Sequence, residues 1–249
     1  MMKLAGTAHR TYPLPTTKPV MAQTWRDLLF AHWPVPVAML RPLIPDTLQI
    51  DTYDGQAWVG VVPFWMSGIR LGPLPPVPFT SRFPELNVRT YVTDGTEPGV
   101  WFFCLDAGNP LAVAVARTWY HLPYFNARMR VRAVGDTVRY ASRRTDGRGE
   151  SARFEATYRP KGAVALSTPG SIEAFLTERY SLYTSDGHGR LYRGEIHHRQ
   201  WPLQIAESRI ERNTMAAAHG ITLPDTPPLL HYAQRLDIAA WAIREFGAP

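Results

Sequence analysis

Lysine, cysteine and long hydrophobic runs are scarce in this chain of 249 residues. Of its 27 basic residues, 24 are arginine and only Lys3, Lys18 and Lys161 are lysine. Because arginine keeps its proton and lysine can lose one, the chain is poor in amine nucleophiles and rich in groups that bind carboxylates or phosphates. Cys104 is the single cysteine and lies in an apolar run, so an internal disulfide is excluded and a buried, inert thiol is expected.

Three further absences narrow the class of protein. No apolar run approaches the roughly 18 residues that cross a bilayer, and the N-terminus lacks the apolar segment of a signal peptide. A cytoplasmic protein without membrane association is therefore expected. Glycine-rich phosphate loops are also missing, and the adjacent His197 and His198 would point to opposite faces of a strand. Neither a metal ion nor a cofactor is expected.

The composition and the frequent prolines and glycines predict a β-rich globular chain. Hydrophobic residues make up 45%, enough for a substantial core, while 23 prolines and 18 glycines divide the sequence into short pieces. The proline-rich segment 68–84 is expected to be a loop over the surface or over a cavity mouth. Short helices are expected at 37–43, 110–120, 171–179 and 213–219. Strands are expected at 57–66, 86–93, 100–106, 127–134, 137–144, 153–159, 180–184, 191–198, 203–212 and 229–241.

Two groups of polar side chains are candidates for a site. Strand alternation places Asn87, Arg89 and Tyr91 on one face, which is either an anion-binding arrangement or an ordinary solvated outer face. Thr177 to Tyr180 form another compact group, in which Glu178 beside an arginine is either an acid or base or simply a charge at a surface helix end.

A third group lies at the end of the helix expected over 110–120. Arg117, Tyr120 and His121 are three and four residues apart and therefore lie together. A proline disfavours further helix after them, so Tyr124 leaves on a turn immediately beyond. This meeting of a cation, two phenols and an imidazole predicts that the segment faces a small-molecule cavity.

Several motifs in order resemble a known family. They are LAVAVARTWYHLPYF at 111–125, NVRTY at 87–91, FLTERY at 175–180 and HRQWP at 198–202. Together they resemble the YqjF-like family of unknown function over about residues 23–241, within a single domain 1–249 with terminal extensions at 1–22 and 242–249. That family is similar to the acetoacetate decarboxylase superfamily. The resemblance implies a β-rich α+β fold, a cone-like double-barrel β-sheet closed around a small cavity, with few short helices.

The resemblance implies a cavity but not the decarboxylase reaction. Acetoacetate decarboxylases carry a lysine pair after an Ala-Val-Gly-Arg-Glu type helix, and the first lysine forms a Schiff base with the keto acid. Here Tyr124 and Phe125 stand at those positions, and a phenol cannot form an imine. Lys161 is expected in an exposed turn. Arg26 falls near the arginine that lies close to the substrate in the decarboxylases.

Three functions stay open. The first is an enzyme, a lyase or hydrolase, acting on a small keto or carboxylic compound without a Schiff base. In it, Arg117 and Arg89 bind the anion, and Tyr124, its pKa lowered by a nearby arginine, is the acid, base or oxyanion donor, with Glu178 as a further catalytic candidate. The second is a non-catalytic module that binds an acidic or keto ligand between walls formed by Trp65, Trp101 and Trp119. The residues expected to contact the ligand are Arg26, Asn87, Arg89, Tyr91, Tyr120, His121 and His198.

The third function is nucleic-acid binding through alternating arginines that begin with Arg128, Arg130 and Arg132. Interleaved acidic residues dilute this stripe, and only Tyr140 and Phe154 could supply stacking aromatics. A solvated sheet face is favoured over nucleic-acid binding, and self-association into a homo-oligomer is left open.

Overall fold

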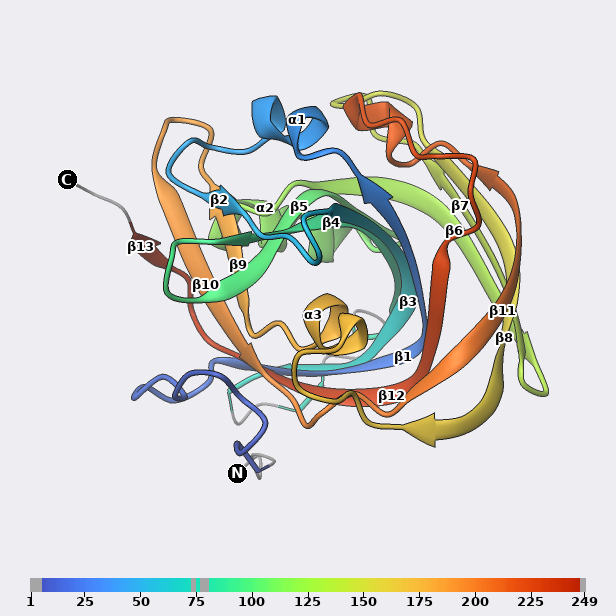
Figure 1. The fold of residues 1–249 in the computed structure, drawn as a ribbon, viewed down its shortest axis with the longest axis horizontal. Helices are drawn as coiled ribbons and strands as arrows, with labels where there is room; N and C mark the ends of the chain where they lie inside the picture. Colours follow the sequence, from blue (N-terminus) through green and yellow to red (C-terminus); the bar gives the residue numbers. More distant parts are fainter. Residues whose placement is uncertain (1–5, 73–74, 77–80, 247–249) are drawn as a thin grey trace.

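The structure is a computed structural model that describes residues 6–72, 75–76 and 81–246. Its described residues form one 13-stranded sheet in which two extra pairings, β4 with β5 and β10 with β12, close the sheet on itself twice. The result is two barrels that share their central strands (Figure 1). The shared strands are β1 (Met21–Val35), β3 (Ala57–Leu71), β4 (Phe83–Thr93), β5 (Pro98–Ala107) and β12 (Leu229–Ala240).

Each barrel is completed by its own strands. The first, called here the cavity barrel, is closed by β9 (Ser181–Ser185) and β10 (Leu191–His197). The second, called the filled barrel, is closed by β6 (Tyr124–Val134), β7 (Thr137–Arg144), β8 (Arg153–Ala165) and β11 (Leu203–Asn213). Short edge strands are β2 (Gln49–Ile50) and β13 (Arg244–Phe246). The β-rich double barrel with few short helices was predicted correctly.

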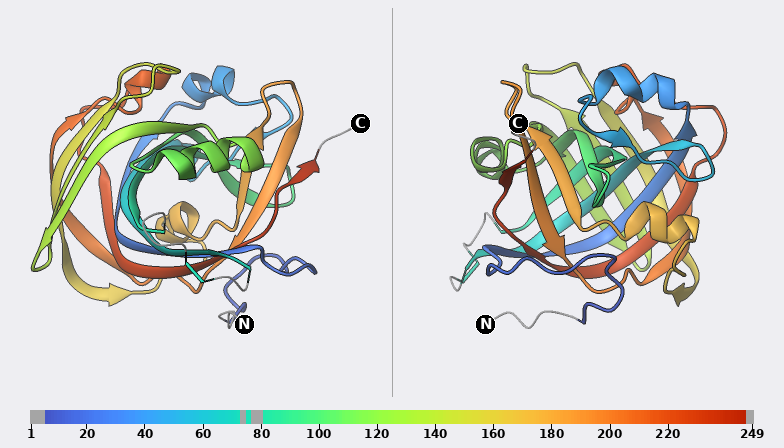
Figure 2. Two further views of the ribbon diagram at one scale, coloured as in Figure 1. Left: turned by 180° about the vertical axis from the view of Figure 1, so that it is seen from behind. Right: turned by 60° about the vertical axis from the view of Figure 1, so that its left-hand side comes forward.

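Short helices close the ends of the cavity barrel. Helix α2 (Pro110–Tyr120) and helix α3 (Ile172–Thr177) lie at opposite ends of it (Figures 1 and 2). Asn109 starts α2 by accepting hydrogen bonds from two backbone amides, and a proline occupies the first turn, where its missing N–H costs nothing. Ser171 starts α3 by accepting a hydrogen bond from the backbone amide of Ala174. The other helices are α1 (Val37–Leu40), η1 (Arg41–Leu43) and η2 (Ala217–His219).

The shared strands are buried on both faces, which explains their composition. In β1, Leu29 and Ala31 pack in the core of the filled barrel, whereas Leu28 and Phe30 pack in the core around the cavity. Such a strand has no polar face and therefore no alternation. For this reason β1, which also carries an Arg-Asp pair and a register shift in mid-strand, was missed in the sequence.

Two predicted segments need correction. The segment 68–84 is not all loop, because β3 continues to Leu71 and β4 starts at Phe83. Of its five prolines, Pro73 and Pro78 lie outside the described residues. The helix expected at 213–219 is only the single 3-10 turn of η2, since β11 runs on to Asn213. No helix within the described ranges is both long and apolar enough to cross a membrane.

Candidate functional site

A cavity of about 370 Å³ lies inside the cavity barrel, and its lining includes residues of α2 and Thr177 at the end of α3. Strand β4 contributes its polar wall, because Glu85, Asn87 and Arg89 alternate along the strand and all line the cavity. Leu86 and Val88, between them, pack in the filled barrel. The predicted sorting of faces is thus confirmed, but the polar face is buried rather than solvated. Most other walls are apolar, among them Trp25, Phe64, Met66, Phe83, Phe102 and Trp201.

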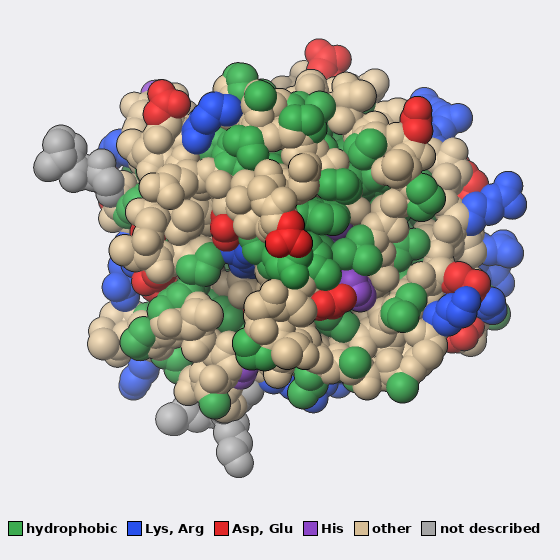
Figure 3. Space-filling model, in the orientation of Figure 1, with side chains coloured by type: hydrophobic (Ala, Val, Ile, Leu, Met, Phe, Trp, Pro, Cys, Tyr) green, Lys and Arg blue, Asp and Glu red, His purple; other side chains and the backbone are tan. Residues whose placement is uncertain are grey.

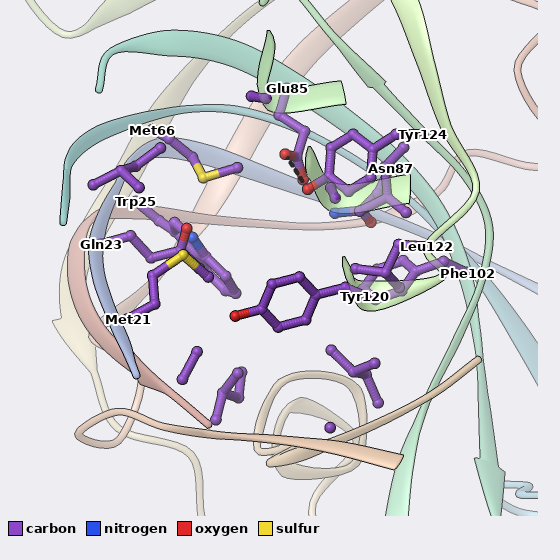
Figure 4. A pocket seen from close by; sticks show the side chains of 18 of the residues that line it. Met21, Gln23, Trp25, Met66, Glu85, Asn87, Phe102, Tyr120, Leu122 and Tyr124 are labelled. Carbon is purple, nitrogen blue, oxygen red and sulfur yellow. Dashed lines mark hydrogen bonds between the residues drawn. The ribbon is translucent and has the colours of Figure 1, made fainter. Parts of the chain in front are cut away.

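Glu85 and Tyr124 form a buried pair in the cavity wall (Figure 4). The Tyr124 hydroxyl donates a 2.7 Å hydrogen bond to Glu85 Oε2, and the two residues are 7% and 2% exposed. Burial raises the pKa of Glu85 to about 8, with a further rise from the charge of Asp106 and a partial reduction by the Tyr124 hydrogen bond. At neutral pH, most Glu85 therefore carries a proton.

Tyr124 does not have the lowered pKa that the sequence suggested. Burial and the neighbouring Glu85 raise the pKa of Tyr124 well above its usual value of 10.0. Arg117, which was expected to bind a ligand and lower this pKa, donates instead to the backbone carbonyl of Tyr124 over 2.8 Å. It is absent from the described cavity lining. Arg117 thus fixes the start of β6, while the phenol faces a carboxyl group.

The backbone of Glu85 is held from the filled barrel. The Tyr140 hydroxyl donates to the carbonyl oxygen of Glu85 at 2.6 Å, and it also lies 3.1 Å from that of Phe64. Tyr140 is 2% exposed, so this contact is shielded from water. The position of the Glu85 carboxyl is consequently fixed by both barrels.

Arg89 and Asn87 are buried with unused hydrogen-bonding capacity. Arg89 is 8% exposed and donates one long bond, 3.3 Å, to the carbonyl of Leu176 in α3. Among the described residues, neither Arg89 Nε nor Asn87 Oδ1 has a hydrogen-bond partner. A buried polar atom without a partner costs free energy, so these two atoms are the unsatisfied part of the polar wall.

Gly60 leaves the space in which Arg89 packs near the buried ring of His32. A Cβ atom on Gly60 would lie 2.9 Å from the His32 ring and 3.5 Å from Arg89 Cγ. His32 lies 2.7 Å from the Tyr91 hydroxyl, which donates to Leu176 O, so the imidazole Nε2 must be the donor. Tyr91, expected to contact ligand, is therefore fully engaged in this network and absent from the described lining.

The other predicted residues divide between the cavity and its supports. Tyr120 and His198 line the cavity, and burial lowers the pKa of His198 to about 3. Glu178 does not: its carboxylate accepts from the backbone amide of Trp201 at 3.0 Å and from the Tyr180 hydroxyl. It holds the loop that carries Trp201, one of the cavity walls, and the structure gives it no contact with the cavity.

Arg26 and His121 also lie away from the described lining. The Arg26 guanidinium donates to Ser67 and lies over the Trp65 ring, while the His121 ring packs against Tyr192 with centroids 4.7 Å apart. The aromatic walls were also misassigned, because the described lining contains Trp25, Trp201 and Trp241 in place of the three tryptophans expected there, Trp65, Trp101 and Trp119.

No lysine lies in the described lining of the cavity. Lys18 is exposed, and Lys161 is on β8 with its ammonium 3.7 Å from Glu207 on the surface. Amine chemistry of the decarboxylase type thus has no lysine to support it among these walls. Within the described ranges, no group of three His, Cys, Asp or Glu side chains has the arrangement of a metal site.

The arginine stripe lies on the outer surface of the filled barrel. Arg128, Arg143 and Arg153 are in register on three neighbouring strands and are exposed. Basic side chains, with acidic ones among them, gather at the right-hand side of Figure 3, the side of β8 and β11 in Figure 1. Tyr140 and Phe154, the aromatic candidates for base stacking, are buried on the opposite face. The stripe has no stacking platform of the kind that single-stranded nucleic acids require.

Comparison with known proteins places the chain in a family. The model of the DUF2071 family, described as an uncharacterized conserved protein, matches residues 22–237. The chain belongs to this family. It is 49% identical over 228 residues to the uncharacterized protein YqjF of Bacillus subtilis (strain 168), covering 92% of this chain and 93% of that protein.

Solved structures show the same fold at low sequence identity. The enduracididine biosynthesis enzyme MppR complexed with pyruvate matches with a TM-score of 0.64 and 11% identity, over 92% of this chain and 91% of that one. An acetoacetate decarboxylase-like enzyme from Sphingomonas wittichii RW1 matches with a TM-score of 0.64 and 13% identity, over 98% of this chain and 100% of that one. The fold is therefore that of the acetoacetate decarboxylase-like proteins.

Sequence reasoning missed the central residue of the site, Glu85. The predicted strand began at Leu86, one residue too late, although Glu85 shares the alternation of Asn87 and Arg89. Extending the period-two pattern by one step toward the N-terminus would have placed a carboxyl group on the same face as the arginine.

Proposed function

We propose that this protein binds a small keto acid in the cavity and that Glu85 transfers a proton at the carbon next to the keto group. The observation that carries the proposal is the buried Glu85–Tyr124 pair in the cavity wall. A carboxylate with a pKa of about 8 is a much stronger base than an exposed glutamate and changes its charge close to physiological pH. Tyr124 holds the carboxyl group in one orientation.

The remaining polar wall suits the ligand that such a base requires. Arg89 would pair with the carboxylate of the acid, and Asn87, which extends beside Tyr124 in Figure 4, would donate from its amide Nδ2 to the keto oxygen. In the proposed step, the Glu85 carboxylate takes a proton from the carbon, and the C–H electron pair forms the enolate. Glu85 then returns a proton, so that no other reactant is consumed. The pyruvate bound by MppR supports this ligand class.

Proton transfer can be measured directly. We expect 2-oxobutanoate incubated with the protein in D₂O to exchange its C3 hydrogens for deuterium, at a rate that rises with pH through about 8 as Glu85 ionises. Proton NMR measures the exchange. Glu85→Gln should lower the rate at least 100-fold, the effect of losing a general base, while leaving ligand-induced thermal stabilisation. The matched control is Glu195→Gln, another carboxyl group in the lining.

A non-catalytic binding module is the second candidate, and the unpartnered atoms of Arg89 and Asn87 favour it equally. In that case, keto acids would raise the melting temperature, as any ligand specific for the folded state does, without deuterium exchange. Exchange that survives Glu85→Gln but disappears in Glu195→Gln would contradict the assignment of the base.

A further inference from the structure

The cavity is larger than a three-carbon acid requires. Its volume of about 370 Å³ falls within the range of roughly 300–1,000 Å³ typical of pockets for drug-sized ligands. The polar groups assigned to the acid, Asn87 and Arg89, occupy the part of β4 nearest α3, where Arg89 donates to Leu176. A small acid seated there would leave the space toward α2 unfilled.

The walls on the α2 side of Glu85 are mostly apolar, with Gln23 and Arg70 as polar members of the lining. In the pairing of β3 with β4, Phe64 lies beside Glu85. Two residues further along each strand, Met66 lies beside Phe83. Met66 also pairs with Trp25 across β3 and β1. In Figure 4, Met66, Trp25 and Met21 surround the space that faces the Tyr120 ring. Two flexible methionines and several aromatic rings form walls that adapt to an apolar group.

Apolar side chains continue to the rim of the cavity. Leu71, at the end of β3, and Leu111, in the first turn of α2, both line the cavity and are 44% and 59% exposed. Each is a large apolar side chain exposed at the surface. A ligand whose apolar end extended to the rim would cover part of both, so their exposure is consistent with a long occupant.

From the cavity volume, the apolar residues that the strand register places beyond Glu85, and the exposed leucines at the rim, we infer that the ligand is a hydrophobic keto acid. This inference rests on the proposed function for the position of the acid head. The carboxylate lies at Arg89, the reacting carbon at Glu85, and an extended alkyl or aromatic substituent passes between Met66 and Tyr120 toward Leu111. The apolar half of the cavity would thus make the binding affinity depend on the chain length of the acid.

A homologous series of acids tests the inference. Dissociation constants of pyruvate, 2-oxobutanoate, 2-oxohexanoate and 2-oxooctanoate would be measured by calorimetry at one pH and salt concentration. Burial of each added methylene should tighten binding by about three- to fourfold until the rim is reached. Phenylpyruvate, which places a ring in the same space, should also bind more tightly than pyruvate. Dissociation constants that stay within twofold across the series would overturn the inference.

A rim variant tests the direction in which the substituent lies. Leu111→Glu places a charge where the apolar end should emerge, and it should weaken 2-oxooctanoate by roughly tenfold while affecting 2-oxobutanoate much less. Ala114→Glu is the matched control, because Ala114 is exposed on the same helix but does not line the cavity. Equal effects of Leu111→Glu on both acids, or equal effects of the two variants, would contradict the placement.

The two proposals fail in different ways. Deuterium exchange in 2-oxobutanoate without a preference for longer acids would retain the proton transfer and overturn the hydrophobic subsite. Tighter binding of longer acids without exchange at any length would support the subsite and overturn the proton transfer.

Discussion

The two barrels share five strands, but the buried polar groups in their interiors differ in hydrogen bonding. In the filled barrel, Tyr140, Phe154 and Tyr158 are at most 2% exposed, and both tyrosine hydroxyls donate to backbone carbonyls. In the cavity barrel, Asn87 Oδ1 and Arg89 Nε are buried without partners among the described residues. The hydroxyls of these two core tyrosines are thus satisfied within the filled barrel, whereas the polar wall of the cavity keeps two atoms without partners.

The shared strands make this division possible. Because successive side chains point to opposite faces, each shared strand contributes to a close-packed core on one side and to the cavity wall on the other. In β4, Leu86 and Val88 support the filled barrel while Glu85 and Asn87 face the cavity. The polar wall is therefore mounted on strands held rigid by packing on their reverse side, as a site that must fix a ligand requires.

The largest difference between the barrels should appear when an aromatic ring is removed from each. Phe154→Ala should lower the free energy of unfolding by about 3–5 kcal/mol, since a buried ring is lost and a cavity is left in a packed core. Phe102→Ala should cost clearly less, because Phe102 is only partly buried and already borders a cavity. Urea denaturation of both variants measures the difference. Equal losses would show that the cavity barrel is as tightly packed as its neighbour.

A second prediction concerns the pH dependence of stability. Burial raises the pKa of Glu85 from its usual 4.5 to about 8, so the folded protein holds this proton more tightly than the unfolded chain. The stabilisation is complete below pH 4.5 and is lost as the pH rises through 8. Glu85→Gln, which stays neutral, should therefore become more stable relative to the wild type by about 1.4 kcal/mol per pH unit across this window.

Unfolding measured from pH 4 to pH 9 would check the Glu85 prediction. Glu155→Gln, at an exposed position on β8, is the control and should run parallel to the wild type. A constant difference between wild type and Glu85→Gln at all pH values would mean that the carboxyl group ionises as it does in the unfolded chain.

Local patterns in the sequence predicted the faces of strands but not what each face meets. Alternation grouped Asn87 with Arg89 because side-chain direction depends only on the neighbouring backbone. Whether that face meets water or a cavity depends on the closure of the sheet by the β4–β5 and β10–β12 pairings, which join distant segments. For the same reason, helical spacing brought Arg117 close to Tyr124 but could not show that its guanidinium binds a backbone carbonyl rather than the phenol.

The smallest predicted effect separates stability from binding at a single side chain. Asn87→Leu removes a buried oxygen without a partner and keeps a similar shape, so it should raise the free energy of unfolding by about 1 kcal/mol. The same change should weaken keto-acid binding, because the amide beside Tyr124 is lost. Asn213→Leu is the control, since Asn213 Oδ1 accepts a 3.2 Å hydrogen bond from the backbone amide of Met215 and its loss should destabilise the protein. A destabilised Asn87→Leu would show that Asn87, like the tyrosines of the filled barrel, is retained for stability.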